Sequence, residues 1–437
     1  MMIWKEKNYK LRTTKEHRQR PHIFVPLEKS NTMHLSNILS IFKKTGPDVE
    51  KVAVLGATGQ QGGSVALSVV LRGIEVVAIT RNPDSESAKD LGSHQGIEVR
   101  KADLNDVESL KAAFEGCDGA FVVANFLENA DVENEMKHYK NAADALKATP
   151  SIRHVIFSTL EESVLPGVTD DFKVLHEHKE TGKMYVPHLD GKNRSEKFFD
   201  GLPTTFLYTS CFFENFTSYF TTQENKDGTY SFTLPLSKDD KMAWTILQDL
   251  GTLVASAFLQ PKKVIGKRIG QASFYATGDE LAEILSKATG KTVTFKSKSW
   301  KEYMKSGVPA DQELGQMFEL WRRKFDEFSR YRQIKEQKKL MDLEMSDPVE
   351  YGKSFADRIQ VQENNAKDKD STIPEGDEGQ EGDQQEKQEG KDSTIPEGDE
   401  AEEGDQQEKQ EGRKEGSKQD DDPNGKEKEL SKEAQKD

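Results

Sequence analysis

Short apolar runs alternate with amphipathic stretches through the first half of the chain. The apolar runs are typical of strands buried on both faces of a sheet, and they lie at 52–55, 75–79, 97–101, 120–123, 154–158 and 204–208. The stretches between them predict helices at 65–70, 85–91, 107–114 and 132–147. Strands and helices that alternate at this spacing predict a parallel sheet covered by helices on both faces. We therefore expect an α/β fold with a Rossmann-type doubly wound parallel sheet.

Beyond Thr217 the glycine signals fade, and the pattern predicts further short strands and helices. Short strands are expected at 230–234, 268–274 and 292–296, and helices at 245–259 and 279–288. A longer amphipathic pattern runs from Asp311 to Met341, with aromatic residues on one side and arginines and lysines around them. Such a basic helix is also typical of nucleic-acid or membrane binding. We favour a docking helix with a solvated basic face, and we expect neither direct nucleic-acid binding nor a membrane partner.

The two ends of the chain lack a pattern that buries a core. Residues 1–48 carry ten Lys and Arg against four Asp and Glu, and we interpret them as a disordered extension, with a transit peptide or nuclear signal as the alternative. Residues 362–437 contain a 22-residue tandem repeat, Lys369–Gly390 followed by Lys391–Gly412. From Glu363 onward, 27 acidic residues against 12 basic ones account for the whole formal charge of −15. We expect a disordered acidic tail.

Cysteine and apolar content narrow the class of protein. Cys117 and Cys211 are too few for a disulfide framework or a cysteine metal cluster. No stretch reaches the ~18 apolar residues of a membrane span, and residues 1–48 lack the apolar core of a secretory signal. We therefore expect a cytoplasmic protein, with the nucleus as an additional compartment, and no metal site.

The stretch Lys51–Gly73 couples the first apolar run to three glycines and then to a helical pattern. In a G-x-x-G-x-x-G turn the first glycine permits a backbone conformation that a side chain blocks, the second admits a pyrophosphate, and the third lets helix pack on strand. The helix N-terminus then holds the phosphates. A turn without a ligand is the alternative, but the strand before it and the helix after it favour dinucleotide binding. The predicted cofactor contacts here are Gly56, Ala57, Thr58, Gly59, Gln60, Gln61 and Gly62.

Residues at the carboxyl ends of the next strands indicate which dinucleotide binds. Arg81 follows the second strand, where an NAD-binding protein would place a carboxylate, and a guanidinium can pair with a 2′-phosphate. We therefore expect NADP(H) rather than NAD, with a solvated loop arginine as the alternative. Asp103 and Leu104 follow the third strand and can bind the adenine, although Asp103 is equally suited to capping a helix. Ala124 and Asn125 follow the fourth strand, where a small side chain leaves room for a ribose or the pyrophosphate.

Several separated motifs together resemble those of the NmrA-like family, an atypical branch of the short-chain dehydrogenase/reductases. They are G-A-T-G-Q-Q-G at 56–62, Arg81, F-S-T-L-E at 157–161, H-L-D-G-K at 188–192 and C-F-F-E-N-F at 211–216. The resemblance runs from about 51 to about 355. It implies one domain at 49–355, with a dinucleotide-binding part at about 49–210 and a smaller α+β lobe at about 211–355 that caps the cleft.

The resemblance also implies roles at the nicotinamide end of the cofactor. Ordinary members of the superfamily have a tyrosine four residues before a lysine, and that tyrosine gives or takes the proton. This chain keeps the lysine as Lys192 but has His188 in the tyrosine position. Lys192 would clamp the ribose and nicotinamide, and His188 is a catalytic candidate only if the protein is an enzyme. Phe212, Phe213 and Asn215 would close over the nicotinamide; an exposed lysine and buried core aromatics are the alternatives.

Two classes of function follow from these residues. In the first, which we favour because the tyrosine is absent, the protein binds NADP(H) with little or no dehydrogenase activity and acts as a redox sensor through a regulatory protein partner. In the second, it is an NADPH-dependent oxidoreductase of quinones or carbonyls that uses His188 or a water. For a sensor we expect the segments 212–215 and 169–185 to become ordered when the cofactor binds.

Overall fold

The computed structural model describes residues 49–362, with the exception of 125, 127–129, 309 and 360. The expected N-terminal extension, the acidic tail beyond Gln362 and the candidate residue Asn125 therefore lie outside the described residues.

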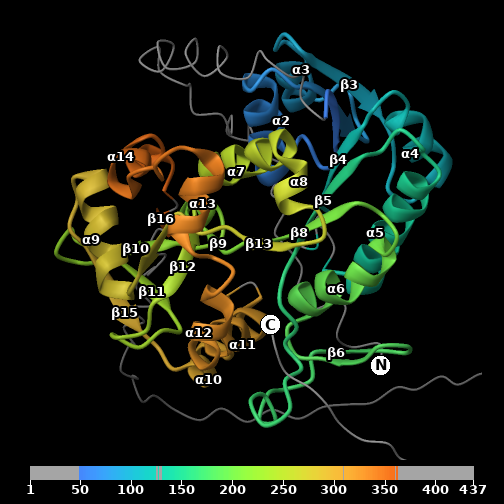
Figure 1. The fold of residues 1–437 in the computed structure, drawn as a ribbon. Helices are drawn as coiled ribbons and strands as arrows, with labels where there is room; N and C mark the ends of the chain where they lie inside the picture. Colours follow the sequence, from blue (N-terminus) through green and yellow to red (C-terminus); the bar gives the residue numbers. More distant parts are fainter. Residues whose placement is uncertain (1–48, 125, 127–129, 309, 360, 363–437) are drawn as a thin grey trace, which may run out of the picture. The chain divides into compact units, whose positions relative to one another are not determined.

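A parallel sheet of seven strands lies at the centre of the part of the chain that the structure describes (Figure 1). Its strands are β1 Lys51–Val54, β2 Glu75–Thr80, β3 Ile97–Lys101, β4 Gly119–Val122, β5 His154–Thr159, β8 Thr204–Tyr208 and β13 Arg268–Gly270. They run in the order β13-β8-β5-β4-β1-β2-β3, and neighbouring strands are parallel throughout. The order reverses between β1 and β4, where a doubly wound sheet has a crevice at its carboxyl edge. The expected Rossmann-type fold is confirmed.

Helices cover both faces of this sheet, and the side chains of its first strand show why. Val52 and Val54 belong to one apolar core, whereas Ala53 and Leu55 belong to the core on the opposite face. A strand buried on both faces needs a continuous apolar run, which is what the sequence has. The helices on the first face are α2 Gln60–Leu71, α3 Glu86–Gly92 and α7 Leu247–Leu259, and those on the second are α4 Val107–Phe114 and α5 Val132–Lys147.

Helix α7 packs closely on α2 because the residues between them are small. A Cβ on Gly251 would lie 2.3 Å from Ser68 Oγ. The Ser64 hydroxyl donates a hydrogen bond to the Leu247 carbonyl at 2.5 Å. The residues of α7 and β13 were expected in the smaller lobe, yet both elements belong to the dinucleotide-binding layer. The expected boundary at 210 therefore does not separate the two parts, which interleave in sequence.

The second lobe, drawn mostly in yellow and orange in Figure 1, has its own small sheets and its own core. Its strands are β9 Cys211–Phe212, β10 Thr222–Glu224, β11 Tyr230–Leu234, β12 Met242–Thr245, β14 Phe274–Ala276, β15 Val293–Ser297 and β16 Val361–Gln362. Among the described residues they pair as β15-β11-β10-β16 and β14-β12-β9. Its short 3-10 helices are η4 Phe213–Thr217 and η5 Ala356–Arg358, and its α-helices include α8 Pro261–Val264, α9 Gly278–Thr289, α10 Trp300–Tyr303 and α14 Pro348–Lys353. Regular structure thus continues past the expected end at 355.

The amphipathic segment 311–341 is not the single docking helix that we expected. It forms α11 Asp311–Arg323, α12 Phe325–Ser329 and α13 Ile334–Met341. Its aromatic residues do pack into the core of the second lobe, but Arg332 is fully buried rather than solvated. The expected strand at 268–274 likewise divides into β13 and β14, which belong to different sheets.

A charged segment before the lysine motif forms a small hairpin. Strands β6 His176–His178 and β7 Gly182–Met184 pair in antiparallel fashion and precede α6 Pro187–Ser195 and η3 Glu196–Phe199.

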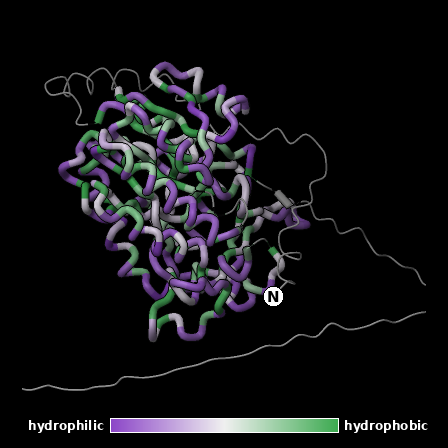
Figure 2. The backbone as a smooth tube through the Cα atoms, turned by 90° about the vertical axis from the view of Figure 1, so that its right-hand side faces the viewer, coloured by the Kyte–Doolittle hydropathy of each residue, from purple (hydrophilic) through white to green (hydrophobic). Residues whose placement is uncertain are grey.

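Along the tube in Figure 2, hydrophobic and hydrophilic stretches alternate at short intervals, as half-buried helices and strands require. None of the helices within the described ranges is both long and apolar enough to cross a membrane.

Candidate functional site

The glycine turn between β1 and α2 has the geometry that its sequence predicts. Gly56 has a φ of +63°, in the left-handed region that favours glycine. A Cβ on Gly62 would lie 2.3 Å from the Gly56 carbonyl oxygen, so that only glycine lets α2 begin this close to the turn. The Gly59 N–H donates to the same carbonyl at 2.9 Å. No side chain among the described residues caps the start of α2, and its first N–H groups are therefore available to a phosphate.

The other residues of the turn connect it to the sheet. Ala57 is buried, whereas Thr58 and Gln60 are half-buried. Gln61 Nε2 donates a hydrogen bond to Ser158 Oγ at 2.7 Å. Because Ser158 lies at the carboxyl end of β5, this bond joins the glycine turn to a strand on the far side of the crevice.

Arg81 and Asp103 lie at adjacent strand ends, because β2 and β3 pair in register up to Thr80 and Lys101. Both side chains are exposed. The backbone N–H of Asn105 donates to Asp103 at 2.8 Å, and this bond, with a smaller effect of the Arg81 charge, lowers the pKa of Asp103. The structure thus places these two predicted residues together at the carboxyl edge of the sheet.

The residues around Asp103 decide between its two expected roles. The cap of α4 is Asp106, whose carboxylate accepts the N–H groups of Glu108 and Ser109. Asp103 is therefore not the helix cap; its carboxylate is exposed and accepts the backbone and side-chain N–H groups of Asn105, and its contact with the adenine stays a prediction. Leu104 is half-buried against the core below α4 and α5.

A chain of polar contacts starts at the end of β4 and reaches Lys192. The backbone N–H of Ala124 donates to the Tyr139 hydroxyl at 3.3 Å, and this hydroxyl donates to Glu135 Oε1 at 2.9 Å. The Lys192 ammonium forms an ion pair with the same carboxylate. Lys192 was expected to be a cofactor clamp or an exposed lysine; its side chain is only 12% exposed, which contradicts the second interpretation.

His188 and Lys192 lie on one face of α6, because the helix continues through Gly191. A Cβ on Gly191 would lie 2.5 Å from Val132 Cγ2, so this glycine allows α6 to pack closely on α5. Asp190, in the same motif, is fully buried and accepts hydrogen bonds from the backbone and the hydroxyl of Ser163 at 2.6 and 2.5 Å. The glycine and the aspartate of H-L-D-G-K are thus structural residues, and they fix where His188 and Lys192 lie.

His188 has a carboxylate partner in the second lobe. Its Nδ1 lies 2.7 Å from Glu313 Oε1, and its backbone N–H donates to the same oxygen at 2.7 Å. The imidazole also contacts Phe126, at 6.0 Å between ring centroids. Because a carboxylate accepts but does not donate, Nδ1 carries the hydrogen, and Nε2 is the ring nitrogen left to accept a proton.

The aromatic motif after β8 divides between the site and the core. Phe213 is fully buried among Phe274 and Phe355, so its expected contact with the nicotinamide is wrong. Phe212 and Asn215 are half-buried, and Asn215 Nδ2 lies 3.7 Å from Cys211 Sγ. Phe212 packs beside the core under α2 and α7. Phe212 and Asn215 therefore stay candidates for contact with the nicotinamide.

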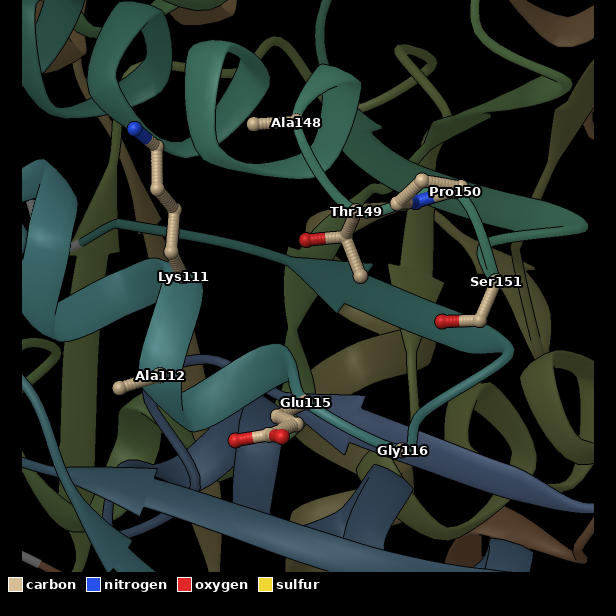
Figure 3. A pocket seen from close by; sticks show the side chains of 8 residues that line it. All are labelled: Lys111, Ala112, Glu115, Gly116, Ala148, Thr149, Pro150 and Ser151. Atoms are coloured by element: carbon tan, nitrogen blue, oxygen red, sulfur yellow. The ribbon is translucent and has the colours of Figure 1, made fainter.

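The hollow in Figure 3 lies away from these residues. It has a volume of about 410 Å³ and is lined by the end of α4 and the segment after α5, including Glu115 and Thr149. Both segments precede a strand, so the hollow is near the amino ends of β4 and β5. Ligands of doubly wound sheets bind at the carboxyl ends, and we assign the hollow no function.

Four residues of this site were missed in the sequence: Glu135, Tyr139, Ser158 and Glu313. Glu135 and Tyr139 are four residues apart on the buried face of α5, and a carboxylate on an apolar helix face is a signal that can be read locally. Glu313 has no such signal, because its contact with His188 spans 125 residues. Within the described residues no group of three His, Cys, Asp or Glu is arranged to hold a metal ion.

The fold and the glycine turn define a Rossmann-type protein of the dinucleotide-binding class. A family model described as "NmrA-like family" matches residues 48–353, and the chain belongs to this family. The resemblance of the separated motifs is thereby confirmed.

Curated relatives differ in what their names say. An NmrA-like family domain-containing protein of Dictyostelium discoideum is 30% identical over 269 residues, 59% of this chain and 83% of the relative. An NmrA-like family domain-containing oxidoreductase of Aspergillus flavus, lnbB, is 28% identical and covers 60% of this chain and 80% of its own. The nitrogen metabolite repression protein nmrA of Emericella nidulans is 26% identical, over 56% of this chain and 67% of the relative.

Solved structures show the same fold. NmrA, a negative transcriptional regulator, matches with a TM-score of 0.57 and 24% identity over 70% of this chain and 94% of its own. NmrA structures in complex with NAD and with NADP are similar at TM-scores of 0.57 and 0.55. An NADPH-dependent quinone oxidoreductase from Escherichia coli, complexed with NADPH, matches with a TM-score of 0.50 and 22% identity. The match covers 69% of this chain and 98% of the oxidoreductase chain.

Proposed function

We propose that this protein binds NADP(H) at the carboxyl edge of its large sheet and acts as a redox-responsive regulator of a protein partner, with little turnover of the cofactor. The glycine turn would hold the pyrophosphate, Arg81 the 2′-phosphate and Lys192 the nicotinamide ribose. Structural neighbours bind NAD as well as NADP, so the preference for NADP(H) rests on Arg81 at the end of β2.

The observation that carries the proposal is the contact between His188 and Glu313. It joins α6, which holds Lys192, to α11 of the second lobe at 2.7 Å. Helix α11 also holds the segment before α6, because Gln316 Nε2 donates to the carbonyls of Lys173 and Tyr185 at 3.0 and 2.6 Å. A change at the nicotinamide end would therefore be felt at α11 in the second lobe, and a sensor requires such a change if its partner is to distinguish liganded from empty protein.

Direct binding combined with hydrogen exchange tests this function. NADPH and NADP⁺ should both bind in calorimetric titration, and NADPH should slow exchange in 169–185 and 212–215. Incubation with NADPH and a panel of quinones and aldehydes should consume negligible cofactor. Absence of dinucleotide binding would contradict the proposal, and so would binding that leaves exchange in both segments unchanged.

An NADPH-dependent oxidoreductase of quinones or carbonyls is the second candidate, and the same imidazole favours it. Nδ1–H held by a carboxylate leaves Nε2 as an acid or base, the arrangement by which a histidine can replace a missing proton donor. Several relatives are named oxidoreductases. Substantial NADPH oxidation that is lost in His188→Gln, with NADPH still bound, would establish the reductase and overturn the sensor.

A further inference from the structure

Glu135 is a buried carboxylate whose charge is compensated by Lys192. Its side chain is 2% exposed, and that of Lys192 is 12% exposed. Within the described part of the chain, Glu135 Oε2 is buried without a hydrogen-bond partner. Since a buried charge is costly unless it is paired, each of the two groups supplies the compensating charge that the other needs.

The carboxylate is held in place by Tyr139. This tyrosine is 1% exposed, and its hydroxyl donates to Glu135 Oε1 at 2.9 Å while it accepts the Ala124 N–H at 3.3 Å. Burial, with a further effect of the Glu135 charge, raises the pKa of Tyr139 well above its ordinary value. The phenol therefore stays protonated and keeps donating to the carboxylate. Glu135 is thus fixed from one side by a neutral donor and from the other by a cation.

We infer that Glu135 allows the site to bind the oxidised as well as the reduced cofactor, by neutralising the charge of Lys192. The inference rests on the proposed function, in which the nicotinamide lies at Lys192. The nicotinamide ring carries a positive charge in NADP⁺ and none in NADPH. An unpaired Lys192 would repel the oxidised ring, whereas the Glu135–Lys192 pair has no net charge and accepts both forms. Glu135 is a positioning and specificity residue, because it acts on the cofactor through Lys192.

The test compares the dissociation constants of NADP⁺ and NADPH in Glu135→Gln. Glutamine keeps the shape and an oxygen for Tyr139 but removes the charge. We expect the ratio of the NADP⁺ to the NADPH constant to rise at least tenfold, because two unit charges about 12 Å apart already give that factor at an effective dielectric constant of about 20 and closer charges give a larger one. Asp144→Asn is the matched control, because it removes a charge from the same helix at an exposed ion pair with Lys140 and should leave the ratio unchanged.

If Glu135 has a purely structural role, Glu135→Gln should weaken the binding of NADP⁺ and of NADPH by the same factor. The ratio of the two constants would then be unchanged, and that result would overturn the inference. Lys192→Met tests it from the other side if Glu135→Gln does not fold, as judged by thermal melting. Removal of the ammonium should lower the ratio of the NADP⁺ to the NADPH dissociation constant, which means tighter relative binding of NADP⁺. A rise in this ratio would overturn the inference. Wild-type protein that binds neither dinucleotide would instead defeat the proposed function, so the two failures are distinguishable.

Discussion

Arg332 and Glu161 form a two-point ion pair inside the protein, although they are 171 residues apart in sequence. The arginine side chain is fully buried, and its Nη2 lies 2.9 Å from Glu161 Oε2. The same nitrogen donates to the Thr209 carbonyl at 2.6 Å, and the guanidinium lies 4.8 Å from the centre of the Trp321 ring. Because Glu161 follows β5 and Thr209 follows β8, this arginine of the second lobe binds residues at the carboxyl ends of two strands of the large sheet.

Arg332→Met should lower the free energy of unfolding by about 3–5 kcal/mol, because it leaves Glu161 buried without its partner. Urea unfolding measures the change. The double variant Arg332→Met/Glu161→Gln should lose less than the single variant, since no uncompensated charge remains. Arg330→Met, at an exposed position nearby, is the control. Equal stability of the Arg332→Met and Arg330→Met variants would show that the ion pair does not hold the lobes together.

The glycine turn predicts different outcomes for two of its glycines. A Cβ on Gly62 would lie 2.3 Å from the Gly56 carbonyl oxygen, whereas one on Gly59 would lie 3.3 Å from it. Gly62→Ala should therefore lower the melting temperature by several degrees, while Gly59→Ala should keep the fold and lose cofactor affinity, because its methyl group lies where the pyrophosphate approaches. Thermal melting and dinucleotide titration separate the two effects. Undiminished NADPH binding by Gly59→Ala would place the phosphates elsewhere.

Arg81→Asp should weaken NADP(H) binding by more than ~1.5 kcal/mol, the scale of a charge-assisted hydrogen bond. The 2′-phosphate would lose its cationic partner and face a carboxylate instead. NAD, which lacks that phosphate, is the control ligand and should bind as before. Calorimetric titration of both dinucleotides gives the comparison, and an equal loss for the two would mean that Arg81 only supports its loop.

Glu214 makes stability depend on pH near neutrality. Burial raises the pKa of this carboxyl from 4.5 to about 7 in the folded protein. The carboxyl accepts hydrogen bonds from the Leu247 N–H at 2.9 Å and the Tyr351 hydroxyl at 2.7 Å. Between these two pKa values the unfolded chain has released the proton that the folded protein keeps, so the free energy of unfolding falls as pH rises.

The loss reaches about 3 kcal/mol once the pH exceeds the folded pKa. Glu214→Gln, which keeps an oxygen for both donors, should flatten the profile measured by urea unfolding between pH 5 and 8. Glu180→Gln removes an exposed carboxyl and should leave the profile unchanged. A parallel profile for Glu214→Gln and wild type would rule out this origin of the pH dependence.

The large sheet could be predicted because its strands are local signals. Each needs an apolar run such as 52–55, since both faces are covered, and the run can be read without knowing its neighbours. The membership of β13 and α7 could not be read in this way. Their sequences are compatible with either lobe. The place of α7 depends on the contact between Gly251 and the serines of α2, more than a hundred positions earlier, and that of β13 depends on its pairing with β8.

The site was predictable to the extent that it follows the glycine turn and the strand ends. Arg81 and Asp103 lie together as expected, because adjacent parallel strands end at the same edge. The partners of His188 and Lys192 were not predictable, because Glu313 and Glu135 meet them only through tertiary packing. Phe213 was misassigned for a related reason: the chain turns from β9 into η4 at this residue, and only tertiary packing shows that its side chain enters the core of the second lobe.

The interleaving of α7 and β13 with the second lobe limits how NmrA-like chains can be recombined. A chimera that joined residues 1–210 of this protein to the remainder of a relative would place α2 of one parent against α7 of the other. The same junction would leave β8 to pair with a foreign edge strand. Fusion at the apparent lobe boundary therefore breaks a core and a sheet edge rather than a linker.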